Sequence, residues 1–86
     1  IEQLRLDKWL WYCRFFKRRR LAANYIKLTG VRINGIKTQK PSALIEMGDV
    51  IIFFVMDELK VIKTLTLGSR RGSFLEASEL FEDRSK

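Results

Sequence analysis

The sequence lacks histidine altogether and contains a single cysteine, Cys13, among its 86 residues. Without histidine, the chain has no side chain of the kind that most often transfers protons near neutral pH. One thiol cannot complete a cysteine-rich zinc site, and the phosphate-binding patterns GxxxxGKS/T and GxGxxG do not occur. A carboxylate pair or the lone thiol are the groups left for catalysis. We therefore expect no enzymatic activity, no metal, no cofactor and no small-molecule substrate.

Long apolar segments are also absent. The longest apolar run, residues 50–56, is far shorter than the roughly 20 residues that a membrane-spanning helix needs. No signal-peptide pattern opens the chain, and no stretch has a linker or low-complexity composition. Cys13 has no partner for an internal disulfide, which fits a reducing compartment. These absences favour a cytoplasmic protein that forms one domain over residues 1–86.

Positive charge, in contrast, is abundant and unevenly distributed. Seventeen lysines and arginines face ten acidic residues, which gives a net charge of +7. Residues 1–43 hold all but six of these basic residues, with only Glu2 and Asp7 as acids, whereas residues 44–86 have a slight acidic excess. A strongly positive half of a small domain attracts nucleic acid or an anionic membrane surface.

Hydrophobic spacing predicts a first helix over residues 6–16. Leu6, Trp9, Leu10 and Cys13 recur at the i, i+3, i+4 and i+7 positions of one helix face. We therefore expect Trp9 to lie in the core and Cys13 to act as a small buried hydrophobe.

A second helix is predicted over residues 18–28, before Gly30, because glycine tolerates the left-handed conformation that often caps a helix. Arg20, Asn24 and Lys27 share its outer face. Arg18 is a poor N-cap, and cations at a helix N-terminus oppose the helix dipole. A local rule broken in this way indicates a functional constraint.

The middle of the chain predicts antiparallel strands. Asn34-Gly35 between β-type residues predicts a two-residue hairpin turn with positive φ at both positions. Residues 50–55 are apolar throughout, which favours a strand covered on both faces over an exposed partner-binding patch. A turn at Asp57-Glu58 then leads into a strand over residues 60–67.

A third helix is predicted near the end of the sequence. Ser73 and Glu76 have the spacing of a capping box, and the helix is expected to reach Asp83. The resulting order, α-α-β-β-β-β-α, predicts an α+β fold with two N-terminal helices packed on a small, mostly antiparallel sheet.

Six short motifs follow one another at tight spacing: RLDKWLW, RFFKRR, LAANYI, GVRING, KPS and GDVI, between residues 5 and 51. As a set they resemble the S4 domain, the RNA-binding domain named for a ribosomal protein, over residues 4–55. The resemblance implies the helix-hairpin RNA-binding fold of that family (the alpha-L motif), and residues 56–86 would add a hairpin strand and a helix.

A narrower resemblance is to the small ribosome-associated heat-shock proteins (the heat-shock protein fifteen family). It depends on Trp9 and Trp11, on the RFFK run, and on SRRG followed by an acidic helix. It implies a bacterial stress-response protein that binds ribosomal RNA of free large subunits still carrying a nascent chain on tRNA. Two points differ from the family pattern: Arg18 replaces the usual capping threonine, and we assume no contacts from the long basic tail that some relatives carry, because this sequence ends at Lys86.

The candidate RNA-binding residues are the basic side chains of the first forty positions. On its own, the block from Lys17 to Arg20 is equally compatible with a solvated helix corner or a nuclear sorting signal. The surrounding cations on neighbouring elements favour contact with RNA. The predicted set is Arg5, Lys8, Arg14, Lys17, Arg18, Arg19, Arg20, Lys27, Arg32, Lys37 and Lys40.

Several residues keep two interpretations. Trp11 and Tyr12 either stack on a base or support the packing of the domain. Arg70 and Arg71 either form a second anion contact or belong to a solvated loop.

The domain as a whole could also be an accessory module of an RNA-modifying enzyme, such as a pseudouridine synthase, or a peripheral membrane binder. We expect a monomer that binds ribosomal RNA and no membrane.

Overall fold

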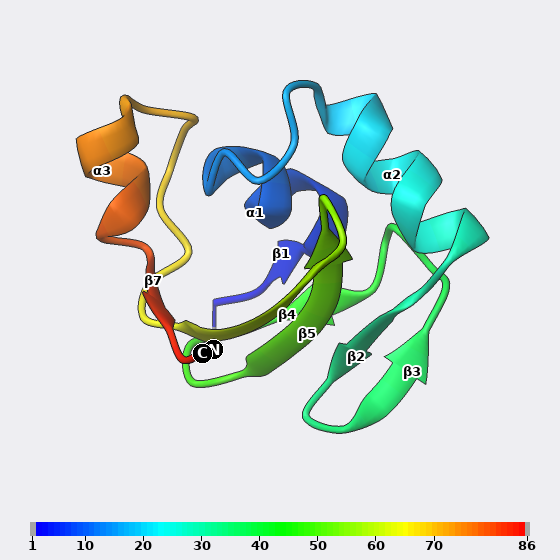
Figure 1. Cartoon of the computed structure of the whole chain (residues 1–86). Helices are drawn as coiled ribbons and strands as arrows, with labels where there is room; N and C mark the ends of the chain where they lie inside the picture. The colour runs from blue at the N-terminus through cyan, green and yellow to red at the C-terminus, as the bar shows by residue number, and fades with distance from the viewer. Residues whose placement is uncertain (1, 86) are drawn as a thin grey trace.

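Residues 2–85, which the computed structural model describes, form three helices and seven strands. The helices are α1 (Leu6–Tyr12), α2 (Arg19–Leu28) and α3 (Phe74–Ser78), and the strands are β1 (Leu4–Arg5), β2 (Val31–Ile33), β3 (Ile36–Thr38), β4 (Leu44–Ile45), β5 (Val50–Val55), β6 (Glu58–Thr64) and β7 (Phe81–Asp83). The main sheet has the order β3-β2-β5-β6-β7, and β1 pairs separately with β4. All neighbouring strands are antiparallel. Helix α1 lies over the curved sheet, between α2 and α3 (Figure 1), so the α+β prediction is confirmed.

The core forms where α1 packs on the inner face of the sheet. Trp9 and Leu10 are fully buried, together with Ile51 and Ile62 of the central strands. Trp9 also donates its indole N–H to the carbonyl oxygen of Thr66 at 3.0 Å, so its polar atom is satisfied. Cys13 is buried as predicted, and burial raises the pKa of its thiol. The thiol therefore remains protonated and unreactive.

The first helix ends at Tyr12, so the prediction that it reaches Phe16 is wrong. Arg14 has a φ of 64°, which takes the chain out of the helical conformation. The following rings pack on other elements: the Phe15 ring centroid lies 5.2 Å from that of Phe53 on β5, and the Phe16 ring centroid lies 5.6 Å from that of Tyr25 on α2. Aromatic packing across the fold thus overrides the local helical pattern.

The β2–β3 hairpin has the predicted turn. Asn34 and Gly35 have φ values of 51° and 86°, the conformation that an Asn-Gly pair adopts readily. The Asn34 side chain also reaches β5: its amide donates to Asp49 Oδ1 at 3.0 Å, and its oxygen accepts the Val50 N–H at 2.9 Å. A turn residue therefore also fixes the hairpin to the central strand.

The β5–β6 hairpin differs from the prediction in two ways. Its turn lies at Met56 and Asp57, which both have positive φ, and β6 accordingly begins at Glu58 and ends at Thr64. Cover on both faces of β5 was also expected, and this is wrong, because Ile51 and Phe53 are buried but Phe54 is 53% exposed. The apolar composition of this strand does not reflect burial alone.

The C-terminal segment contains a helix and an additional strand. Ser73 and Glu76 form the predicted capping box, but the helix ends at Ser78 rather than near Asp83. Residues 81–83 form β7 instead, with Phe81 opposite Thr64 of β6 and its ring 4.8 Å from that of Phe15. Within residues 2–85, no helix has both the length and the apolar character needed to cross a bilayer.

Candidate nucleic-acid interface

A buried carboxylate organises the basic residues at the start of α1 and α2. The Asp7 side chain is only 4% exposed, and its oxygens lie 3.2 Å from the Arg5 guanidinium and 3.6 Å from that of Arg19. Arg5 comes from β1 and Arg19 is the first residue of α2. Asp7 therefore holds two arginines from different elements side by side while they remain partly exposed.

Two more predicted residues lie close to this pair. The backbone N–H of Asp7 donates to the Pro41 carbonyl oxygen at 3.2 Å, and the backbone N–H of Leu6 donates to the Ala43 carbonyl oxygen at 2.8 Å. These bonds hold the segment that follows Lys40 against the start of α1. Lys8 lies one residue after Asp7, with its ammonium group 5.8 Å from the Tyr12 ring centroid. The backbones of Lys8 and Lys40 are therefore placed next to the start of α1.

The outer side of α2 continues the positive surface. Arg20, Asn24 and Lys27 are exposed and recur with helical spacing. Lys17 and Arg18 are exposed just before the helix, and Arg18 occupies the N-cap without a capping hydrogen bond from its side chain. Among the ion pairs of residues 2–85, none involves these cations, so their charges are available to an anion.

The hairpin adds Arg32 and Lys37 at the other end of α2. They are opposite each other on β2 and β3, and the Arg32 guanidinium donates to the Gly35 carbonyl oxygen at 3.0 Å. Lys37 lies across Gly30, whose φ is +90°, and a Cβ atom built there would lie 2.6 Å from the lysine Cε. Glycine at this position therefore lets the lysine approach the helix end.

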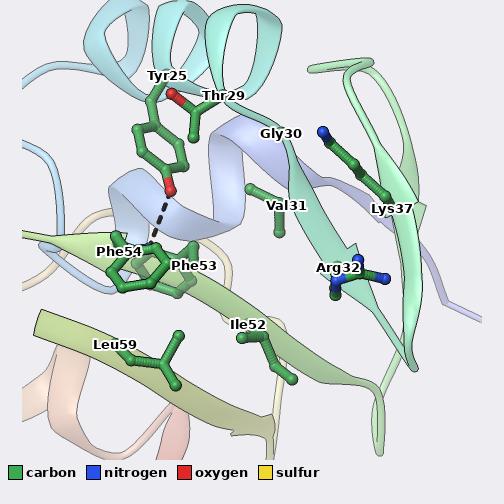
Figure 2. A pocket seen from close by; sticks show the side chains of 10 residues that line it. All are labelled: Tyr25, Thr29, Gly30, Val31, Arg32, Lys37, Ile52, Phe53, Phe54 and Leu59. Carbon is green, nitrogen blue, oxygen red and sulfur yellow. Dashed lines mark hydrogen bonds between the residues drawn. The ribbon is translucent and has the colours of Figure 1, made fainter.

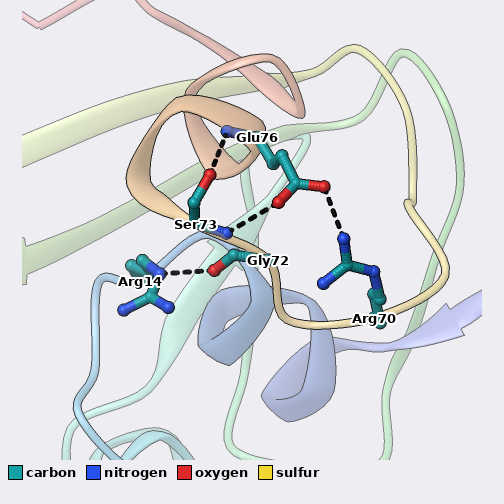
Figure 3. A network of polar contacts seen from close by, with 5 residues as sticks. All are labelled: Arg14, Arg70, Gly72, Ser73 and Glu76. Atoms are coloured by element: carbon teal, nitrogen blue, oxygen red, sulfur yellow. Dashed lines mark hydrogen bonds and ion pairs between the residues drawn. The ribbon is translucent and has the colours of Figure 1, made fainter.

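Three arginines lie instead around α3. Figure 3 shows Arg14 donating to the Gly72 carbonyl oxygen at 2.7 Å and Arg70 paired with Glu76 at 2.7 Å. Arg71 donates to the carbonyl oxygens of Trp11 and Phe16 at 3.1 and 3.4 Å. Desolvation, and then the charge of Arg14, lowers the pKa of Arg71. Arg71 therefore contributes to the packing of the loop, and Arg14 shares its guanidinium between the loop and solvent.

The aromatic residues of α1 support the fold. Tyr12 is buried and donates its hydroxyl to the Ser69 carbonyl oxygen at 3.2 Å. Trp11 is half-buried beneath the Arg71 guanidinium, which lies 5.4 Å from its ring centroid. Of the two interpretations left open by the sequence, the structure favours packing for both residues.

Replacing Arg71 by alanine is expected to destabilise the domain by about 2 kcal/mol, because two hydrogen bonds to backbone carbonyls and a cation–π contact are lost. Arg70→Ala is the matched control, since an exposed ion pair contributes roughly 0–1 kcal/mol. For a domain of this size, the first change corresponds to a melting temperature lower by about 10 °C, which thermal unfolding followed by circular dichroism would measure. Equal losses for the two variants would contradict the structural role of Arg71.

Comparisons with known proteins agree with this arrangement. The profile of the S4 domain family matches residues 4–51. A heat shock protein 15 homolog from Aeromonas salmonicida is 36% identical over 81 residues, covering 94% of this chain and 61% of the relative. Heat shock protein 15 from Escherichia coli is 31% identical over 84 residues, covering 98% of this chain and 62% of the relative. The chain thus spans about three fifths of the length of these curated relatives.

A solved structure shares the fold. It is described as the trimeric structure of Vibrio cholerae heat shock protein 15, is 36% identical, and superposes with a TM-score of 0.88 over 95% of this chain and 82% of that one. The family profile covers more than half of the present chain, including both basic helices and the hairpin. The chain is therefore a member of the S4 domain family, in the branch that contains heat shock protein 15.

Proposed function

We propose that this domain binds structured ribosomal RNA through one basic surface and performs no bond chemistry. The surface comprises the start of α1, the outer side of α2 and the β2–β3 hairpin. The observation that carries the proposal is the buried Asp7 carboxylate, which positions Arg5 and Arg19 beside the exposed cations of α2. The predicted contacts on or beside this surface are Arg5, Lys8, Lys17, Arg18, Arg19, Arg20, Lys27, Arg32, Lys37 and Lys40. Arg14, also predicted from the sequence, lies apart from it beside the loop before α3.

The chemistry of these side chains suits a phosphate backbone. Each contact between a cation and a phosphate releases condensed counterions, which makes binding favourable at low salt. The planar guanidinium group can donate two parallel hydrogen bonds to phosphate oxygens. Because the helices and the hairpin form a fixed surface, the backbone geometry of folded RNA is the feature that they would recognise.

The cellular partner that we propose is the large ribosomal subunit. The relatives are named heat shock proteins and come from bacteria, which supports a role in stress. We propose that this role is cytoplasmic and is carried out on subunits that retain a nascent chain on tRNA. We predict a monomer in solution, although the solved relative is described as a trimer.

Binding to isolated large subunits is expected to weaken steeply as salt increases. About six phosphate contacts would lower the affinity roughly a thousandfold between ~50 and ~200 mM salt. Cosedimentation of the protein with separated subunits over a salt series measures this dependence, with small subunits as the comparison. Cosedimentation that does not change with ionic strength would contradict the proposed electrostatic docking.

A further inference from the structure

A groove of about 260 Å³ opens at the C-terminal end of α2, beside the basic surface. Figure 2 shows its walls: Tyr25 descends from the helix, Arg32 and Lys37 lie on the hairpin side, and Ile52, Phe54 and Leu59 come from β5 and β6. The groove lies where the end of α2 meets the sheet, and the buried residues Val31 and Phe53 form part of its lining. Neither the sequence patterns nor the phosphate contacts proposed above account for it.

The apolar wall of the groove presents an accessible aromatic ring. Phe54 and Leu59 are opposite each other on β5 and β6 and are 53% and 48% exposed. Tyr25 fixes this wall, because its hydroxyl oxygen accepts the backbone N–H of Phe54 at 2.9 Å. Among the hydrogen bonds of residues 2–85, none uses the hydroxyl hydrogen of Tyr25, which therefore can donate to a ligand.

The hairpin side of the groove is cationic. Arg32 and Lys37 are opposite each other on β2 and β3, and both line the groove. Arg32 is fixed by its hydrogen bond to the Gly35 carbonyl oxygen, and Lys37 passes close to Gly30. A ligand that fits must combine a flat face for the Phe54 ring with a negative group for these two cations. A nucleotide has both features, since its base stacks on aromatic rings and its phosphate pairs with arginine and lysine.

We propose that this groove receives one unpaired nucleotide of the bound RNA, with the base on Phe54 and the phosphate toward Arg32 and Lys37. This inference rests on the proposed RNA-binding function. The exposed row of Arg20, Asn24 and Lys27 connects the groove to the rest of the basic surface. It runs along α2 from the Arg5 and Arg19 pair around Asp7 toward the groove. A base inside a duplex is stacked on its neighbours, so the groove selects RNA with a bulge or loop.

Two RNA probes test the proposal: a plain duplex, and the same duplex with one bulged 2-aminopurine, whose fluorescence reports stacking. The wild-type domain is expected to bind the bulged probe about tenfold more tightly, which corresponds to about 1.4 kcal/mol. Phe54→Ala should remove this preference and leave the affinity for the duplex unchanged. Phe74→Ala, which removes a still more exposed ring on α3, outside the groove, should retain this preference. Phe54→Leu keeps an apolar side chain but lacks the aromatic face, and it should lose the preference as Phe54→Ala does. Because this variant is expected to stay folded, its loss of preference would not be explained by unfolding.

The possible failures are distinguishable. Equal wild-type affinity for both probes, with steep salt dependence, would overturn the groove proposal and leave the RNA-binding function intact. No binding to either probe would overturn the function itself. A bulge preference retained in Phe54→Leu would also overturn the assignment. If sedimentation velocity showed a wild-type oligomer that Phe54→Leu dissociates without changing RNA binding, the groove would be a contact between copies of the chain.

Discussion

Charge reversal at Arg18 and Arg20 is expected to weaken RNA binding strongly without unfolding the domain. Each single variant, Arg18→Glu or Arg20→Glu, should weaken binding about tenfold, and the double variant about a hundredfold, because hydrogen bonds to charged groups contribute roughly 1.5–3 kcal/mol each. Both side chains are exposed. Glutamates at the start of α2 also suit the helix dipole, so the melting temperature should stay the same or rise slightly.

The control for this experiment is Arg84→Glu, which has the same charge change as each single variant. Arg84 is exposed and follows β7, at the opposite edge of the sheet from β2 and β3. Its reversal should change binding only slightly, through the lower overall charge. Arg19 is less suitable for charge reversal, because a glutamate there would face the buried Asp7 carboxylate and lower stability. Equal losses for Arg84→Glu and Arg20→Glu would show that net charge, and not this surface, determines the affinity.

Asp7→Asn is expected to weaken RNA binding about tenfold, although it raises the net charge from +7 to +8. A purely long-range attraction between a cation and a polyanion would make the variant bind more tightly. The opposite result is expected because Arg5 and Arg19 lose the carboxylate that holds their guanidinium groups in place. Fluorescence anisotropy titration of the same RNA measures the difference.

The matched control is Asp57→Asn, because Asp57 is exposed in the β5–β6 turn and asparagine also tolerates its positive φ. This variant should bind RNA as tightly as wild type or slightly more tightly. Binding is measured at a temperature at which both variants are folded, so that an effect on arginine positioning is distinguished from a loss of stability. If Asp7→Asn strengthened binding as Asp57→Asn does, Asp7 would serve only to reduce the surface potential.

The sequence predicted those features that depend on neighbouring residues. The end of α2 at Leu28, the Asn34-Gly35 turn and the Ser73 capping box each follow from residues close by in the sequence, and the structure confirms them. The buried positions of Trp9 and Cys13 follow from helical periodicity in the same way. Such signals are strong because local geometry alone satisfies them.

The features that were missed depend on contacts between distant parts of the chain. Helix α1 stops early because the Phe15 ring packs on β5 and β7 of the sheet. Arg71 is structural because it meets Trp11 from 60 positions away. The cations of the site could be named from the sequence, but not the arrangement of Arg5 and Arg19 around Asp7. One signal was available: Asp7 is one of only two acids in a half of the chain that is otherwise strongly basic.

The attachment of Asn34 to β5 bears on how fast a partner can associate. Its side-chain hydrogen bonds to Asp49 and Val50 fix the β2–β3 hairpin before any ligand binds. The backbone entropy of the hairpin is therefore lost during folding and not during complex formation. Encounter then requires no slow ordering step. The association rate should approach the electrostatically steered limit, and differences in affinity between RNA targets should appear mainly in their residence times.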